Sequence, residues 1–181
     1  MALRLDKMND NFILTIDNVF SKEICKSLIK EYSKKLKKED NKYRGYQYFD
    51  IDLKNFSHYD LLLNCIYKYK EKYPEVNLTS SFWNLTNLRY KMWKKGSFFK
   101  EYHSEHCFLN PYRILAIQLY LTSHKCGTEF FNKKIINSEI GRVCIFPAYF
   151  THTHKGQPDL KKSRSILTGY VEFVAPGTTE K

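Results

Sequence analysis

The stretch that decides the fold class is Ile114-Leu-Ala-Ile-Gln-Leu-Tyr-Leu121, a run of apolar and β-forming residues with the length of one strand. Similar short runs, broken by Gly, Pro and Asn, begin after Thr86, and this texture is typical of an antiparallel β domain. We therefore expect strands at Leu88–Trp93, Phe98–His103, Ile114–Leu121, Thr128–Phe130, Arg142–Phe146, Phe150–His154 and Ile166–Phe173.

Two helices are predicted to precede this β region. Ser21 stands where its side chain can cap a helix, and the apolar stripe of that helix is Ile24, Leu28, Tyr32 and Leu36. A second helix is expected from Ser57, with its apolar face at Leu62, Cys65, Ile66 and Tyr69. Helices followed by many short strands indicate an α+β chain that is mainly β, a double-stranded β-helix (jelly roll) buttressed by helices. We expect one domain over residues 1–181, with helical support at about 1–85 and the jelly-roll core at about 86–175.

Composition narrows the choice of compartment and partner. The formal charge of +11 invites a nucleic-acid partner, but lysine runs on predicted helices are also common on solvated faces, and the sequence leaves both readings open. No window approaches the roughly 18 apolar residues of a membrane helix. The N-terminal residues lack an apolar run of secretory length, and the five cysteines form no Cys-x-x-Cys pair. We expect a cytoplasmic protein with reduced, mostly buried cysteines, no membrane contact and an oligomeric state that the sequence does not reveal.

A candidate metal site begins at His103-Ser104-Glu105. Residues two apart point to the same face of an extended chain but diverge by about 200° on a helix, so this pair converges on an ion only from a strand or its end. A third ligand is available at His152 or His154, which strand alternation alone does not separate. Two imidazoles and one carboxylate form the facial triad of Fe(II) oxygenases. Zinc also accepts two His and one Glu, although the zinc hydrolase signature His-Glu-x-x-His is absent.

Arg164 is a candidate partner for an anionic co-substrate. It opens the predicted strand before Ile166, and a buried guanidinium needs an anion that its planar fork can bind. A co-substrate that chelates iron through a 2-oxo acid and carries a distal carboxylate fits that need. Alternation places Arg164, Ile166 and Thr168 on one face, but it does not say whether that face is buried or, like Lys161 and Lys162, solvated.

Together these motifs resemble the prolyl 4-hydroxylase-like branch of the Fe(II)/2-oxoglutarate dioxygenases, and the likeness covers most of the chain. It rests on Thr15–Cys25, on Trp93-Lys-Lys-Gly96 with Phe98–Glu105, on Arg113–Thr122 with Gly127-Thr-Glu-Phe130, on Gly141–Gly156 and on Arg164–Tyr170. The resemblance implies that His103, Glu105 and His154 hold the metal and form the catalytic centre, since the family's Thr-His-Arg/Lys-Gly element selects His154 over His152. It also implies that Arg164, Tyr120, Thr168 and Trp93 bind the co-substrate. Two departures are Glu105, where the better-known members have Asp, and Cys126, where a second Gly is common.

The activity implied by the resemblance is hydroxylation of a C–H bond, with Fe(II), 2-oxoglutarate and O2 consumed to give succinate and CO2, and with ascorbate as a possible stimulant. The family's usual target is a prolyl residue in a peptide or protein. The alternatives are the same chemistry on a nucleic-acid base or a small molecule, and a non-catalytic jelly-roll binding module. We also predict that Asn41–Phe56 is a loop covering the substrate, that His58 and His124 lie at the surface, and that the aromatic residues Tyr46, Tyr48, Trp93 and Tyr170 either cradle a proline ring or belong to the core.

Overall fold

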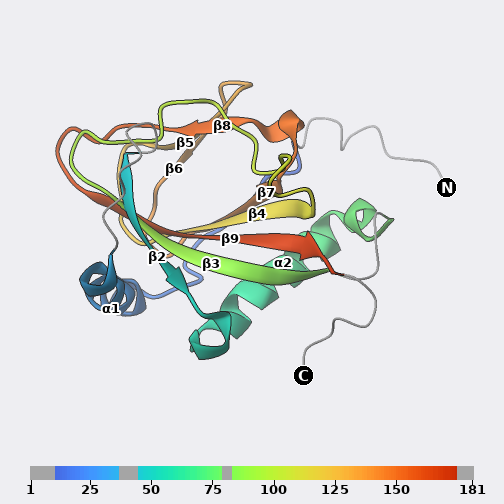
Figure 1. The fold of residues 1–181 in the computed structure, drawn as a ribbon, viewed down its shortest axis with the longest axis horizontal. Coiled ribbons are helices and arrows are strands. Elements are labelled where there is room, and N and C mark those ends of the chain that lie inside the picture. The colour runs from blue at the N-terminus through green and yellow to red at the C-terminus, as the bar shows by residue number, and fades with distance from the viewer. Residues whose placement is uncertain (1–10, 37–44, 79–82, 175–181) are drawn as a thin grey trace.

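The computed structural model describes residues 11–36, 45–78 and 83–174 (Figure 1). Its α-helices are α1 (Lys22–Tyr32) and α2 (Tyr59–Lys72), and short 3-10 turns lie at Ser33–Lys35, Leu53–Asn55, Pro74–Leu78 and Phe150–His152. The strands are β1 (Leu14–Ile16), β2 (Tyr46–Ile51), β3 (Trp83–Trp93), β4 (Arg113–Tyr120), β5 (Gly127–Phe130), β6 (Ile135–Asn137), β7 (Val143–Pro147), β8 (His154–Gly156) and β9 (Arg164–Phe173).

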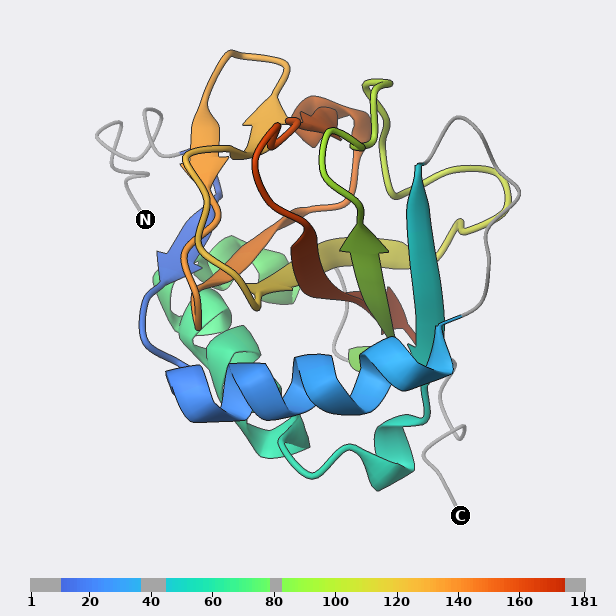
Figure 2. The ribbon, with the colours of Figure 1, turned by 90° about the vertical axis from the view of Figure 1, so that its left-hand side faces the viewer.

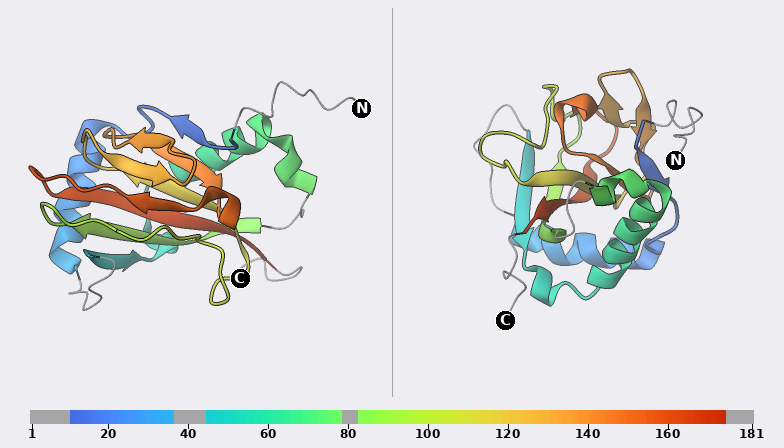
Figure 3. Two further views of the ribbon diagram at one scale, coloured as in Figure 1. Left: turned by 90° about the horizontal axis from the view of Figure 1, so that it is seen from above. Right: turned by 90° about the vertical axis from the view of Figure 1, so that its right-hand side faces the viewer.

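The strands form two antiparallel sheets that lie one above the other. The large sheet has six strands in the order β1-β7-β4-β9-β3-β2, and the small sheet has three in the order β6-β5-β8. Figure 1 shows the small sheet over one face of the large sheet and both helices against the other face, and Figure 3 shows the same layers from above and from the side. The predicted jelly roll buttressed by helices is confirmed.

Alternation along the central strands gives the large sheet two buried faces. On β4, Leu115, Ile117 and Leu119 belong to the cluster that packs on the helices, whereas Ala116 and Tyr120 belong to a second cluster, which contains Phe130 and Ile136 of the small sheet. A strand covered on both sides has no solvated face, which explains why Ile114–Leu121 is almost continuously apolar. Polar residues on the inner face of β4 or β9 therefore lie between the two sheets.

Helix α1 forms as the sequence predicts. The Ser21 hydroxyl oxygen accepts a hydrogen bond from the Ile24 backbone N–H at 3.2 Å, and Cys25, Leu28 and Tyr32 are buried while the lysines face solvent. Figure 2 shows α1 running across the face of the large sheet. Helix α2 begins at Tyr59 rather than Ser57, because Ser57 lies in a turn and no side chain caps this helix.

Several boundaries differ from the predictions. Phe98–His103 is not a strand, since within it only His103 pairs, in an isolated bridge with His154. The predicted strand Phe150–His154 is a 3-10 turn followed by the start of β8. Residues 46–51 of the predicted covering loop form the edge strand β2, paired with β3, and residues 41–44 lie outside the described residues. In the described part of the chain, no helix has both the length and the apolar character needed to cross a membrane.

Candidate metal and co-substrate site

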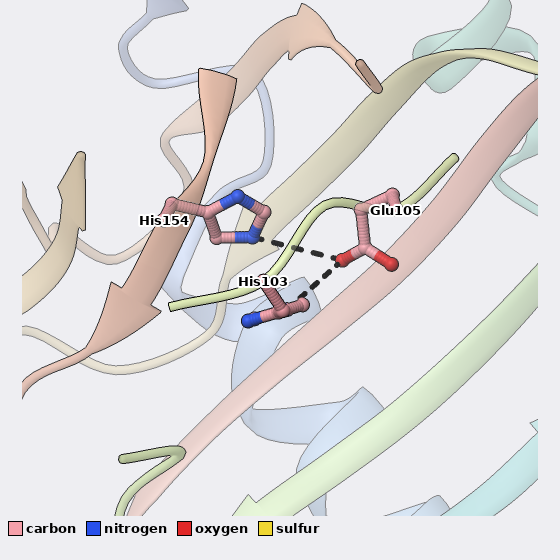
Figure 4. Close-up of side chains that lie close together, drawn as sticks. All are labelled: His103, Glu105 and His154. Carbon is pink, nitrogen blue, oxygen red and sulfur yellow. Dashed lines mark ion pairs between the residues drawn. The ribbon is translucent and has the colours of Figure 1, made fainter. Parts of the chain in front are cut away.

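Three side chains converge between the two sheets. The Nε2 atoms of His103 and His154 each lie 3.6 Å from the same oxygen of Glu105, Oε1, and one ligand atom from each residue falls within 4.8 Å of the other two (Figure 4). His154 and Glu105 are buried, at 3% and 9% exposure, and His103 is partly open. The three residues leave one side of the group open, which is the geometry that a facial metal site requires.

The backbone fixes the separation of the two histidines. His103 and His154 exchange two backbone hydrogen bonds of 3.0 Å, which join the segment after Phe99 to β8. Glu105 is anchored in the same way, because its N–H donates to the Ala148 carbonyl at 3.0 Å and the neighbouring Ser104 hydroxyl donates to that carbonyl at 2.7 Å. Residues far apart in the sequence are thus held in register without any contribution from the side chains that meet.

The imidazoles are turned so that their Nε2 atoms face the site. His103 Nδ1 lies 3.2 Å from the Glu101 carbonyl, and His154 Nδ1 lies 3.0 Å from the His152 carbonyl. A backbone carbonyl next to Nδ1 accepts a hydrogen bond from Nδ1–H, so the ring proton stays on Nδ1 and the lone pair of Nε2 is free, which is how proteins orient histidine ligands. Burial lowers the pKa of His154, which favours the neutral form that binds a metal.

Glu105 is held in its ionised form. Burial alone would raise the pKa of its carboxyl group, but the polar surroundings formed by His103, His154 and Lys91 outweigh burial and hold that pKa well below its ordinary value. Its second oxygen, Oε2, accepts a hydrogen bond from the Tyr170 hydroxyl at 2.7 Å and lies 3.6 Å from Nη1 of Arg113. The site therefore presents one carboxylate and two imidazole nitrogens, a donor set that fits Fe(II).

Every residue predicted for the site lines one inner cavity of about 40 Å³. The metal group lies on its wall together with Trp93, Tyr120, Arg164 and Thr168. Thr168 and Arg164 are on the inner face of β9. The sequence left open whether this face is buried or solvated, and in the structure it lies between the two sheets. Gln118 and Thr128, which sequence reasoning missed, join the same wall and bond to each other at 2.8 Å.

Arg164 is a buried cation with spare hydrogen-bonding capacity. It is 5% exposed, its guanidinium carbon lies 4.8 Å from the centre of the Trp93 ring, and its Nη1 donates to the backbone carbonyls of Gly127 and Gln157. Its Nε and the Thr168 hydroxyl are buried polar atoms without a hydrogen-bond partner. Within the described residues no carboxylate lies in ion-pair range of Arg164. A buried guanidinium beside an unpartnered hydroxyl fits an anionic ligand such as a carboxylate.

A larger cleft of about 750 Å³ adjoins the inner cavity, and the two share Lys91, Phe99, His103 and Glu105. Strand β2 and the turn after it form part of the wall of this cleft, together with Arg113 and Tyr170. Of the four aromatics predicted to meet substrate or core, Tyr46 and Tyr170 line the cleft, and Trp93 lines the inner cavity instead. His103 and Glu105 thus lie where the inner cavity meets the larger cleft, and His154 lines the inner cavity.

The comparison with known proteins finds similarity at the level of structure. A viral collagen prolyl hydroxylase from Paramecium bursaria Chlorella virus 1, in complex with 2-oxoglutarate, aligns with a TM-score of 0.70 at 18% identity, over 90% of this chain and 97% of that one. A prolyl-4-hydroxylase from Pseudomonas putida aligns with a TM-score of 0.71 at 15% identity, over 94% and 97% of the two chains. The chain has the prolyl hydroxylase fold. No family model and no curated protein sequence matches it.

A further structure with the prolyl hydroxylase fold is the prolyl hydroxylase from Trichoplax adhaerens, in complex with a peptide fragment of the hypoxia inducible factor oxygen degradation domain. It aligns with a TM-score of 0.68 at 12% identity, over 93% of this chain and 86% of that one. Identities this low establish the shared architecture, so the roles of individual residues are argued below from the geometry of this chain.

Three histidines outside the metal group lie in places that the sequence described poorly. The prediction that His124 lies at the surface is wrong: it is buried, with its Nδ1 bonded to Asp159 and its Nε2 2.8 Å from the Thr122 hydroxyl. His152 lies in the turn before β8, where its Nε2 contacts the Asn11 carbonyl. The ring of His106 packs against that of Tyr149 in a tilted arrangement, with ring centres 4.8 Å apart. His124, Cys126 and Asp159 lie within 4.8 Å of one another, but the direct His124–Asp159 bond accounts for this group as a tie between two loops of the prolyl hydroxylase fold.

Proposed function

We propose that this protein is an Fe(II)- and 2-oxoglutarate-dependent oxygenase that hydroxylates a C–H bond, with a prolyl residue of a peptide or protein as the target. One observation carries the proposal. A carboxylate with two imidazoles lies on one wall of a buried cavity, and on the same cavity is an Arg that lacks an anionic partner among the described residues. The co-substrate 2-oxoglutarate requires both groups, because it chelates a metal at one end and carries a carboxylate at the other.

In this proposal His103, Glu105 and His154 hold the iron. When bound together, iron, 2-oxoglutarate and O2 supply the oxidant that places one oxygen atom in the substrate C–H bond and the other in succinate, with loss of CO2. The chain contributes the positions of the groups. The carbonyls of Glu101 and His152 keep the ring protons on Nδ1, so that Nε2 of each imidazole stays free for the metal.

The distal carboxylate of 2-oxoglutarate is assigned to Arg164 and Thr168. A guanidinium and a hydroxyl that are already desolvated bind a carboxylate with little further cost, which is why unpartnered buried groups point to a ligand. Tyr120 supports this end, since its hydroxyl lies 2.8 Å from that of Thr128. Lys91 and Phe99 line both the inner cavity and the outer cleft, so the co-substrate passes these two side chains on its way to Arg164.

The substrate is assigned to the outer cleft. Its volume of about 750 Å³ suits a peptide segment, and it reaches the metal group at His103 and Glu105. Tyr46 offers an aromatic wall to an apolar ring, and Lys91, whose Nζ lies 5.1 Å from the centre of the Tyr46 ring, closes the passage toward the inner cavity. A cleft that admits the target residue but narrows at the metal group keeps the reacting C–H bond close to the metal and excludes water.

The experiment that tests the proposal measures succinate formed from 2-oxoglutarate with Fe(II) and ascorbate, with and without a panel of proline-rich peptides. We expect peptide-stimulated succinate from the wild type and none from His154→Ala. Succinate that no peptide stimulates would keep the oxygenase and refute the prolyl target. Iron-loaded wild-type protein that forms no succinate under any condition would refute the oxygenase and leave the non-catalytic binding module.

A further inference from the structure

The two oxygens of Glu105 have different partners. Oε1 lies 3.6 Å from the Nε2 atoms of both histidines, whereas Oε2 accepts the Tyr170 hydroxyl hydrogen bond at 2.7 Å. An unrestrained glutamate can offer either oxygen, or both, to a metal. Here one oxygen is already occupied by a donor on β9, so the other alone faces the imidazoles.

Tyr170 is itself held in place by Arg113. The guanidinium carbon of Arg113 lies 3.5 Å from the centre of the Tyr170 ring, and its Nη1 lies 3.6 Å from Oε2 of Glu105. Arg113 is fixed in turn by Glu172, whose Oε1 accepts from Nε at 3.2 Å, and by the Glu105 carbonyl, 3.4 Å from Nη1. A cation over a phenol ring withdraws electron density from the hydroxyl, which makes Tyr170 a stronger donor.

This arrangement gives a physical reason why position 105 can carry a glutamate in place of the shorter aspartate. Glutamate has one more rotatable bond, so an unsupported carboxylate loses more conformational freedom when it binds a metal. The Tyr170 hydroxyl restricts that freedom before any metal arrives. Strand β9 thereby serves both ends of the cavity, with Arg164 at one end and Tyr170 beside the metal group, both on its inner face.

We propose that Tyr170, braced by Arg113, is a positioning residue that reserves Oε2 of Glu105 and leaves Oε1 as the single oxygen presented to the metal. The inference rests on the proposed function, because it assigns Glu105 as a metal ligand. It goes beyond that function because it names Tyr170 and Arg113 as the pair that allows a glutamate to serve as the metal ligand at this position.

The first test is Mn(II) binding, measured by calorimetry without substrate, so that the readout does not depend on turnover. Tyr170→Phe removes one hydroxyl and is expected to weaken Mn(II) affinity about tenfold or more, in the range seen when a group that orients a metal ligand is lost. Tyr90→Phe is the matched control. Its hydroxyl is equally buried and lies 3.0 Å from that of Ser165, but it belongs to the helix-side cluster. Both variants lose one buried hydrogen bond, and only Tyr170→Phe should lose affinity.

The second test is a double-mutant cycle. Glu105→Asp retracts the carboxylate from Tyr170 by one methylene, so in that background Tyr170→Phe should have no further effect on Mn(II) affinity. A hydroxyl that merely stabilises the fold would weaken both backgrounds equally. Because Tyr170→Phe also removes a buried hydrogen bond, urea unfolding is followed for each variant. Arg113→Met provides a second route that leaves the Tyr170 hydroxyl in place but removes the guanidinium that packs on its ring, and a smaller loss of affinity is expected.

The outcomes separate the two proposals. Wild-type protein that binds no Mn(II) would refute the proposed function and this inference together. Wild-type protein that binds Mn(II), with Tyr170→Phe equal to Tyr90→Phe or additive with Glu105→Asp, would refute this inference alone. Loss of affinity in Tyr170→Phe that disappears in the Glu105→Asp background supports it.

Discussion

Among the residues of the site, Arg164 carries most of the free-energy cost of burying polar groups. Its guanidinium is desolvated between the sheets, and burial lowers its pKa, yet its Nε has no hydrogen-bond partner. Such a group is retained only where a ligand supplies the missing partner. The geometry of the fork, and not the charge alone, should decide how well that ligand binds.

We therefore predict that Arg164→Lys raises the KM for 2-oxoglutarate roughly 10- to 100-fold, because hydrogen bonds to a charged group contribute on the order of 1.5–3 kcal/mol. The measurement is initial-rate succinate formation over a range of 2-oxoglutarate concentrations. Arg142→Lys is the control, since Arg142 pairs with Asp17 outside the cavity. An unchanged KM in Arg164→Lys would remove Arg164 from the co-substrate site.

Substitutions of His154 and of His152 should have clearly different effects on the iron content of the protein. His154→Ala is expected to leave the purified protein without iron, because its Nε2 faces Glu105. His152→Ala should retain iron, since its ring bonds to the Asn11 carbonyl and the Thr151 hydroxyl, although it should lose some stability. Metal content per protein, measured by plasma emission after loading with Fe(II), gives the answer. The reverse pattern would exchange the assigned roles.

The convergence of His103, Glu105 and His154 could be predicted from the sequence in part because the spacing of the first two residues carries structural information. His103 and Glu105 point to one side only from an extended chain, and the residues around them exclude a helix. The choice of His154 over His152 needed the family resemblance. Gln118 and Thr128 were missed because a polar residue inside an apolar run gives no sign of which face it occupies. His124 was misread because its partner, Asp159, lies on a distant loop that only the fold brings close.

At the scale of the element, β9 divides two functions between alternate residues. Leu167 belongs to the helix-side cluster, and its neighbour Thr168 lies on the wall of the inner cavity. One strand thus packs against the helices with one face and lines the candidate co-substrate cavity with the other. Substitutions at adjacent positions should therefore have unrelated consequences.

For this strand, Leu167→Ala should lower the free energy of unfolding by about 2–5 kcal/mol through the cavity that it leaves, with little change in 2-oxoglutarate affinity. Thr168→Val keeps the side-chain volume and removes only the unpartnered hydroxyl, so it should weaken 2-oxoglutarate binding and leave stability equal or higher. Urea unfolding and calorimetric titration of each variant separate the effects. Loss of both properties in both variants would mean that the two faces are not independent.

Asp159 links the loop before β5 to the loop after β8. Its carboxylate accepts from His124 Nδ1, and its other oxygen accepts from the backbone N–H groups of Lys161 and Lys162. The hydrogen bond from His124, with support from those backbone groups, lowers the pKa of Asp159 from 3.8 to about 2. A carboxyl group whose pKa is depressed in the folded state stabilises the fold above its ordinary pKa and loses that effect as the pH falls through the folded value.

Asp159→Asn is accordingly expected to lower the melting temperature near neutral pH. The difference from wild type should shrink as the pH falls from 3.8 toward about 2, where Asp159 itself becomes protonated. Differential scanning calorimetry across that range measures it. A difference that stays constant with pH would show that the charge of Asp159 plays no part in holding the loops.

Helices and strands could be predicted from the sequence where each of their faces lies in a single environment, either the core or the solvent. Helix α1 and strands β4, β7 and β9 were located because apolar spacing marks their contacts. The segment Phe98–His103 was mistaken for a strand because it is rich in β-forming residues, although within it only His103 forms a β-bridge. Strand β2 was not predicted because it lies at the edge of the large sheet, and its residues line the cleft as well as packing in the core.

At the scale of the whole molecule, the lysines of α1 lie on the opposite side of the large sheet from the site, whereas the cleft itself is lined by Lys54, Arg89, Lys91 and Arg113. The lysines of α1 are exposed, and both helices cover the face of the large sheet opposite the small sheet (Figure 1). The metal group and the inner cavity lie on the other face. A substrate bound in the cleft is thus separated from the helix lysines by the large sheet itself.

We predict that turnover of a neutral proline-rich peptide depends weakly on salt and is not stimulated by oligonucleotides. Screening acts mainly on exposed, unpaired charges. The helix lysines are remote from the cleft, and within the cleft Arg89 is paired with Asp50 and Arg113 with Glu172. Succinate formation measured across a salt series, with and without single-stranded DNA, tests this. A steep fall with salt, together with stimulation by DNA, would instead favour a nucleic-acid base as the target.

The reciprocal backbone bonds between His103 and His154 link the completion of folding to the capacity for chemistry. His103 and His154 are neighbours only where the segment after Phe99 lies against β8, the strand that pairs with β5 in the small sheet. On the proposed function, a molecule in which this contact is missing has no place for iron, even if its helices and large sheet are formed. The iron content of a preparation would then report how many of its molecules have closed this side of the fold.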